Sequence, residues 1–251
     1  MKKLLFAALL LFVFLGKAFA FDDIKFSAGM TQSLFKDFSD QLGVALSYKP
    51  VSPAEPYGVT GFDIGVEASA VKLDNKYWKH AIKGGDVPSF AIIPKLHVIK
   101  GLPFGIDVGA VYSQVPNTNI KYFGGEVKYA LMKGSAVTPA VALRGTYTQL
   151  LGVHQLDFKT YGAEATISKG LGFGVKLTPY AGVGVTWFQS KPTGFASDSV
   201  SSGGLGLDKE NSTHPKAYAG ARFTIVLLAI TGEVELNDVT PVYSLKAGLA
   251  F

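Results

Sequence analysis

The chain has no cysteine and few charged residues. Among its 251 residues, charged side chains make up only 17%, whereas apolar residues make up 48%. Without cysteine, the chain cannot form a disulfide-stapled scaffold, a thiolate-ligated zinc or iron–sulfur site, or a cysteine nucleophile. The low charge and high apolar content also exclude a disordered chain, which needs the opposite composition.

Long apolar runs are missing beyond the N-terminus. The mean hydropathy of +0.26 is high for a soluble globular protein. Yet no later segment approaches the roughly 18 consecutive apolar residues that a membrane-spanning helix needs. The alternative in lipid is a closed β-barrel, because there every backbone N–H and C=O group must be paired within the protein.

The first twenty residues have the features of a secretory signal peptide. Lys2 and Lys3 form a positive start, residues 4–15 are apolar, and residues 18–20 match the A-x-A cleavage pattern. We expect cleavage after Ala20 and export in a Gram-negative bacterium. Cleavage would remove three lysines and no acid, so the formal charge would fall from +5 to +2. The composition then no longer indicates a nucleic-acid partner.

From residue 59 to residue 251, apolar residues alternate with small or polar ones in runs of roughly ten residues, as in transmembrane β-strands. We predict an all-β, antiparallel, up-and-down barrel of ten strands, with eight or twelve as alternatives. Aromatic residues at the ends of the apolar faces favour this barrel over a soluble sandwich. The predicted strands are residues 62–70, 90–98, 104–113, 121–131, 139–151, 156–168, 175–188, 215–226, 229–237 and 242–251.

The predicted connections alternate in length. Short turns follow the second, fourth, sixth and eighth strands, and the longest connections are residues 74–87 and 190–214. Bacterial barrels have short periplasmic turns and longer outer loops. The alternation therefore predicts that both chain ends lie on the periplasmic side.

The last ten residues carry a specific motif. Tyr243, Leu245, Ala247, Leu249 and Phe251 share one face of the last strand, and the final residue is aromatic. This segment resembles the C-terminal assembly signal of bacterial outer-membrane β-barrel proteins. The resemblance implies an integral outer-membrane protein whose partners are membrane lipid, periplasmic chaperones and the barrel-assembly machinery. It assigns the signal to Tyr243, Leu245, Leu249 and Phe251.

Residues 21–58 differ from the rest and are expected to form a helix and a linker. Apolar residues recur every four positions from Met30 to Leu46, which is a helical period. Residues 49–57 hold three prolines. The helix could plug the lumen or lie on the membrane interface, and an extra strand at residues 42–48 is the competing interpretation. A segment ahead of the first strand also faintly resembles the N-terminal plug of fatty-acid transport channels, although those channels have more strands and a longer plug.

The polar faces of the predicted strands carry equal numbers of acidic and basic side chains. In a narrow barrel these charges should pair, because an isolated buried charge is costly. This favours a side-chain-filled interior or a narrow pore lined by both signs, without strong ion selectivity. The predicted lumen-lining residues are Asp63, Glu67, Lys95, His97, Asp107, Glu126, Lys128, Arg144, Glu164, Lys176, Lys216, Arg222, Glu233, Glu235 and Lys246.

No sequence motif indicates catalysis. The chain has no Gly-x-Ser-x-Gly segment, and none of its four histidines is spaced with a serine and an acid as a hydrolase would need. We therefore expect no enzyme activity, catalytic residue, metal site or cofactor. The expected function is that of a passive channel or transporter for a small solute, which could be apolar. The alternatives are a structural or surface-interaction barrel with a closed lumen, and a lipid-modifying enzyme.

Overall fold

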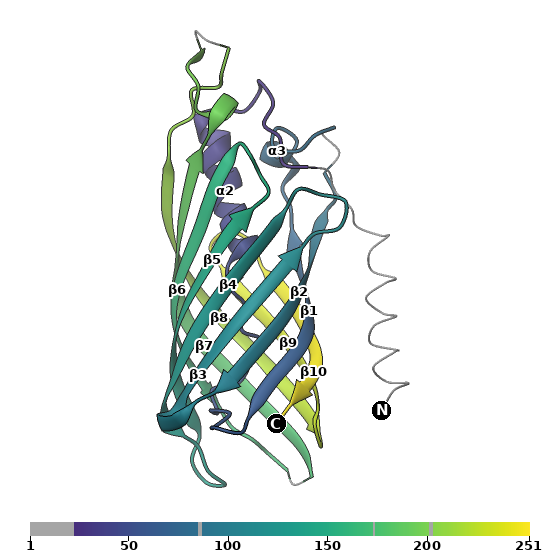
Figure 1. Ribbon diagram of the computed structural model, residues 1–251, viewed down its shortest axis with the longest axis vertical. Coiled ribbons are helices and arrows are strands. Elements are labelled where there is room, and N and C mark those ends of the chain that lie inside the picture. The colour runs from purple at the N-terminus through teal and green to yellow at the C-terminus, as the bar shows by residue number, and fades with distance from the viewer. Residues whose placement is uncertain (1–22, 85–86, 173, 201–202) are drawn as a thin grey trace.

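The computed structural model describes residues 23–84, 87–172, 174–200 and 203–251. The predicted signal peptide lies outside the described residues. Ten antiparallel strands close into one barrel in the order β1-β10-β9-β8-β7-β6-β5-β4-β3-β2 (Figure 1). Each strand pairs with its sequence neighbours, and the last strand pairs with the first. The prediction of a ten-strand up-and-down barrel is thus confirmed, and the alternatives of eight and twelve strands are wrong.

The strand boundaries follow the predicted alternation closely. The strands are β1 (Phe62–Lys72), β2 (Phe90–Gly101), β3 (Ile106–Gln114), β4 (Lys121–Lys133), β5 (Ala140–Leu151), β6 (Leu156–Ser168), β7 (Val175–Pro192), β8 (Glu210–Ile225), β9 (Leu228–Asn237) and β10 (Val242–Ala250). The main difference is in β7 and β8, whose ladder continues to the pair Ser190–Glu210. The predicted bounds of this connection, 190–214, are therefore wrong, and the connection spans residues 193–209. Residues 210–215 are mostly polar, and so they lack the apolar alternation that marks strands in lipid.

The two ends of the barrel differ. We call the end with the β1–β2, β3–β4, β5–β6, β7–β8 and β9–β10 connections the loop end, and the opposite end, where β10 finishes, the turn end (Figure 1). The first described residues lie at the loop end, since Ile24 pairs with Ile82 of the β1–β2 connection. The Ile24 N–H also donates to Asn119 Oδ1 at 3.0 Å in the β3–β4 connection. The described chain therefore starts opposite Phe251, contrary to the expectation that both ends share one side, because it runs through the barrel before β1 begins.

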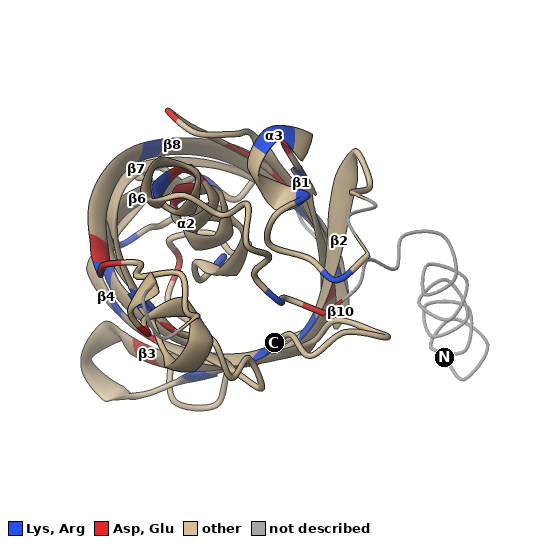
Figure 2. Ribbon diagram, turned by 90° about the horizontal axis from the view of Figure 1, so that it is seen from above, with Lys and Arg blue, Asp and Glu red and all other residues tan. Residues whose placement is uncertain are grey.

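Helix α2 (Gln32–Leu46) lies inside the barrel in its loop-end half (Figures 1 and 2). Thr31 caps its first turn by accepting the Leu34 N–H. The apolar face predicted from the four-residue period is buried at Phe38, Leu42 and Leu46. The segment is thus neither an interfacial helix nor a strand over residues 42–48. A second, one-turn helix, α3 (Asn75–Trp78), lies in the β1–β2 connection. No helix among the described residues is long and apolar enough to cross a bilayer.

The two faces of the barrel wall have opposite chemistry. Outward-facing positions such as Leu131, Val183 and Leu245 are apolar and exposed. Toward the turn end, inward-facing positions are polar or charged and buried, as Lys128 and Lys246 are. This is the reverse of a water-soluble barrel, whose exposed face is polar and whose buried face is apolar.

Candidate functional site

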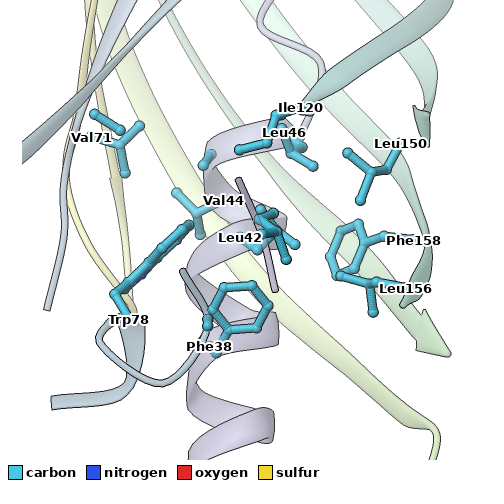
Figure 3. Packing of buried hydrophobic residues seen from close by; sticks show 14 of the residues in the cluster. Phe38, Leu42, Val44, Leu46, Val71, Trp78, Ile120, Leu150, Leu156 and Phe158 are labelled. Atoms are coloured by element: carbon cyan, nitrogen blue, oxygen red, sulfur yellow. The ribbon is translucent and has the colours of Figure 1, made fainter. Parts of the chain in front are cut away.

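The interior has an apolar zone in the loop-end half. Phe38, Leu42 and Leu46 of α2 belong to one buried cluster with inward-facing wall residues (Figure 3). The Phe38 ring meets the Trp78 ring edge to face at a centroid distance of 4.9 Å. Each large apolar side chain that is fully buried stabilises the packing by roughly 1.5–3 kcal/mol. The wall contributes Val71, Ile93, Val111, Ile120, Leu150, Leu156 and Phe158 to the cluster.

Polar contacts fix α2 against the wall around this cluster. The Ser39 Oγ donates to Ser190 Oγ of β7 at 2.8 Å. The Gln41 Oε1 accepts from the Trp78 indole N–H and, at 3.0 Å, from the Asp74 backbone N–H. Ser39 and Gln41 are both buried, and these hydrogen bonds give each of them the partner that a buried polar side chain requires.

Asp40 is a third polar residue of the helix that contacts the wall. Its Oδ1 lies 3.2 Å from His214 Nε2, and the His214 Nδ1 lies 2.8 Å from Asp238 of the β9–β10 connection. Burial would raise the pKa of the Asp40 carboxyl, but hydrogen bonds from His214 and Ser212 and the charge of Lys36 lower it below its usual value. The ionised Asp40 therefore helps to hold α2 against β8.

The interior has a charged zone toward the turn end, and residues 47–58 pass through it. Wall cations donate to the backbone or a hydroxyl of this segment: Lys246 to Pro50 O (3.2 Å), Arg222 to Val51 O (3.4 Å), Arg144 to Ser52 Oγ (3.1 Å) and Lys128 to Glu55 O (3.0 Å). The proline-rich linker has few internal hydrogen bonds, so its carbonyls are free to accept from the wall.

Ion pairs join the wall residues to one another. Asp63 pairs with Arg222 (2.6 Å) and Lys246 (3.1 Å), and Asp107 with Lys128 (2.9 Å). The remaining ion pairs are Glu67 with Lys95, Glu126 and Glu164 with Arg144, and Glu164 and Glu235 with Lys216. The His97 Nδ1 also lies 3.3 Å from Glu67 Oε2. Glu233 instead accepts from the Tyr180 hydroxyl at 2.9 Å. Pairing of this kind is what a narrow interior demands of opposite charges.

Of the fifteen residues predicted to line the lumen, all but Lys176 are buried in the barrel. Lys176 lies near the turn end, where its side chain is 44% exposed and pairs with Glu55. The other fourteen lie together in the charged zone. Whether they line a conducting path stays a prediction, because in this structure the zone is filled by side chains and by residues 47–58.

Three residues of the charged zone could not be identified from the sequence pattern. Lys49 pairs with Glu235 at 2.9 Å, the Tyr57 hydroxyl donates to Asp63 at 2.7 Å, and the Tyr48 hydroxyl lies 2.7 Å from His97 Nε2. Lys49 and Tyr57 belong to the predicted linker, and Tyr48 ends the stretch for which a strand is the competing interpretation. The sequence shows only that Lys49 lies beside a proline-rich stretch, and this does not indicate which residue it contacts.

The predicted assembly-signal residues face outward on β10. Tyr243, Leu245 and Phe251 are exposed. Phe251 also closes the seam, because its backbone exchanges hydrogen bonds of 2.9 and 3.0 Å with Phe62 at the start of β1. A role for these residues in assembly stays a prediction.

Comparison with known proteins finds similar folds but no relatives by sequence. No family model and no curated protein matches the chain. The attachment invasion locus protein Ail of Yersinia pestis is 17% identical with a TM-score of 0.34, covering 76% of this chain and 97% of its own. The KdgM porin is 6% identical with a TM-score of 0.35, and the match covers 76% of this chain and 99% of the porin. Neisserial surface protein A is 10% identical with a TM-score of 0.30, and the match covers 75% of this chain and 95% of that protein. These are outer-membrane β-barrel proteins.

Proposed function

We propose that this chain is an integral β-barrel of the bacterial outer membrane and a gated passage for a small solute. Residues 23–58, which we call the plug, close the passage. The observation that carries the proposal is that one continuous segment, and not the wall alone, fills the interior along its length. A segment that precedes the first strand can move without breaking the pairing among the ten strands, which is what a gate requires.

The outer face supports a place in a membrane. Tyr112, Phe123, Tyr147, Tyr161 and Trp187 form an aromatic band across five neighbouring strands toward the loop end. Within it the rings of Phe123 and Tyr147 lie 6.3 Å apart, and those of Tyr147 and Tyr161 5.3 Å apart. Such bands mark the boundary between hydrocarbon and water in transmembrane barrels. With the predicted signal peptide and C-terminal motif, the band supports the outer membrane.

The lumen walls support the kind of solute. Ten strands make a barrel only slightly wider than eight, which wall side chains alone can fill. Here the loop-end wall instead presents Val71, Ile93, Val111, Leu150 and Phe158 to the plug. Withdrawal of α2 would leave an apolar chamber above a charge-balanced zone, which suits a solute with an apolar part.

One observation favours a second candidate, a permanently closed barrel with a structural or surface-interaction role. Four wall cations and the Lys49–Glu235 pair hold residues 49–55 in place. In this case the plug would be part of the core and would not move.

A disulfide lock separates the two candidates. The Ser39 and Ser190 hydroxyl oxygens are 2.8 Å apart, and the chain has no other cysteine to interfere. The doubly substituted Ser39→Cys/Ser190→Cys protein should conduct in planar bilayers when reduced and fall silent when oxidised. The single variant Ser39→Cys is the control for the chemistry of the reagents. A barrel that is silent in both states, while the plug stays in place, supports permanent closure.

A further inference from the structure

A cavity of about 540 Å³ opens at the turn end, where the plug leaves the barrel. Its apolar wall comes from the β2–β3 turn, at Leu102, Pro103 and Phe104. Its polar wall comes from other turns and strands, and includes Lys133, Ser135 and Lys176. Glu55 is the one acid among the lining residues.

The Glu55 carboxylate already occupies an anion site in this cavity. It pairs with the Lys176 ammonium, and its Oε1 accepts the Gly170 N–H at 3.1 Å. Both partners belong to the β6–β7 hairpin, whereas Glu55 belongs to the plug. A Cβ on Gly170 would lie 2.9 Å from this Oε1 and 2.2 Å from the Lys176 Cε. The absence of a side chain at position 170 is therefore what lets a carboxylate approach the hairpin.

The apolar wall of the cavity has an unusual backbone. Phe104 is 86% exposed and has a φ of 65°, a left-handed conformation that is unfavourable for a residue other than glycine. The two-residue turn between β2 and β3 requires this conformation at Phe104 and at Gly105, whose φ is 77°. The cavity thus combines a large exposed apolar surface with two cations, which is the pattern that recognises a ligand with an apolar body and an anionic head.

We propose that this cavity binds a small amphipathic carboxylate, and that Glu55 is an internal occupant that the ligand displaces. This deepens the proposed function and rests on it, because it names the solute class. Displacement has a route through the plug: the Glu55 carbonyl accepts from Lys128, and the same segment continues through Ser52 and Pro50 toward α2. A ligand at the turn end would loosen the segment that closes the lumen.

The test measures hexanoate binding to the full mature chain by calorimetry in phosphatidylcholine nanodiscs, with empty nanodiscs subtracted. Hexan-1-ol reports the apolar part alone, and inorganic phosphate reports an anion without an apolar body. We expect hexanoate to bind more tightly than either. Glu55→Gln should tighten hexanoate binding by roughly two- to fivefold, because the ligand then no longer has to break the partly exposed Glu55–Lys176 ion pair.

Two further variants and a control complete the test. Lys176→Gln should weaken hexanoate binding roughly two- to fivefold, because the ligand loses one partly exposed ion pair. Gly170→Ala should weaken it while all charges stay in place. Asp157→Asn is the control, since it removes a comparably exposed acid whose partner, Lys159, lies 3.6 Å away and outside the cavity; its binding should match the wild type. Heat-dependent gel mobility verifies folding of each variant.

The proposal is overturned if Glu55→Gln binds no more tightly, if Lys176→Gln binds as well as the wild type, or if hexan-1-ol binds as well as hexanoate. These outcomes differ from failure of the proposed function. A protein that conducts when its plug is released but fails here keeps the gate and loses the solute class. A protein that binds as expected but never conducts keeps the site and loses the gate.

Discussion

At the scale of single residues, the Lys246–Asp63 pair joins the two strands that close the barrel. Lys246 stands opposite Glu67 in the β1–β10 ladder, yet its ammonium lies 3.1 Å from Asp63 and donates to Pro50 O. Glu67 is satisfied by Lys95 and His97 from β2. Backbone register alone therefore does not choose the partner of a long side chain.

A double-mutant cycle tests this choice. Lys246→Ala should destabilise the barrel by about 3 kcal/mol, the low end for breaking a buried pair, because Asp63 keeps Arg222 as a partner. Asp63→Asn should show a coupling with Lys246→Ala of roughly 0.5–3 kcal/mol. Refolding titrations in lipid give both numbers. Strict additivity with Asp63→Asn, together with coupling to Glu67→Gln, would contradict the assigned pair.

The acid sensitivity of the helix contact depends on Asp40. The pKa of the Asp40 carboxyl in the folded protein is below its ordinary value of 3.8. Above pH 3.8 the ionised carboxylate therefore binds its partners and stabilises the docked helix. The stabilisation is lost as the pH falls below about 3.8 and through the folded pKa. Fluorescence of Trp78, which packs against Phe38, should report loosening in this range. Asp40→Asn should remove the pH step, and a step of unchanged size in that variant would assign it to another group.

At the scale of elements, α2 is held mainly by its apolar face. Phe38→Ala should cost about 3–5 kcal/mol, as large-to-small changes of buried aromatic residues do. Ser33 is exposed on the same helix, so Ser33→Ala is the matched control and should be nearly neutral. Thermal unfolding followed by circular dichroism measures both. Equal effects of the two changes would mean that the helix face has been assigned wrongly.

The strands are held in lipid by their outward face. Val183 of β7 is 61% exposed on that face, and Val183→Arg should cost about 2–4 kcal/mol if it lies near the bilayer midplane. Val200, in the β7–β8 connection, is 74% exposed, and Val200→Arg should have little effect. Refolding into lipid vesicles provides the comparison. A harmless Val183→Arg would place this strand face outside the hydrocarbon.

Strands could be predicted from sequence where lipid imposes alternation, and hardly at all beyond it. Ala181, Val183 and Val185 alternate with small or polar residues, and their strand was found. The continuation of β8 through Asn211 and Ser212 was missed, because these residues lie toward the loop end and carry no apolar period. Pairing there is fixed by the neighbouring strand and not by local pattern.

The helix illustrates a different limit. Its period predicts an amphipathic helix, but the same period suits a lumen and a membrane interface. Only the closed wall around it decides between them. For the same reason the partners of Lys49 and Tyr57 could not be predicted, since tertiary placement alone brings them to Glu235 and Asp63.

At the scale of the whole molecule, the barrel is a closed wall with a separate filling. The wall pairs every strand and would remain continuous without residues 23–58. The filling meets an apolar zone through α2 and a charged zone through the linker. We propose that this filling, and not the wall, keeps the passage closed.

The most direct test is the conductance of the barrel without its plug. A chain that lacks residues 23–58 is refolded into planar bilayers beside the full mature chain, and heat-dependent gel mobility verifies that both have folded. We predict steady conductance with little preference for ion sign in the shortened chain, because the wall charges nearly balance, and only occasional brief openings in the full chain. A folded, shortened chain that conducts no more than the full chain would contradict the account.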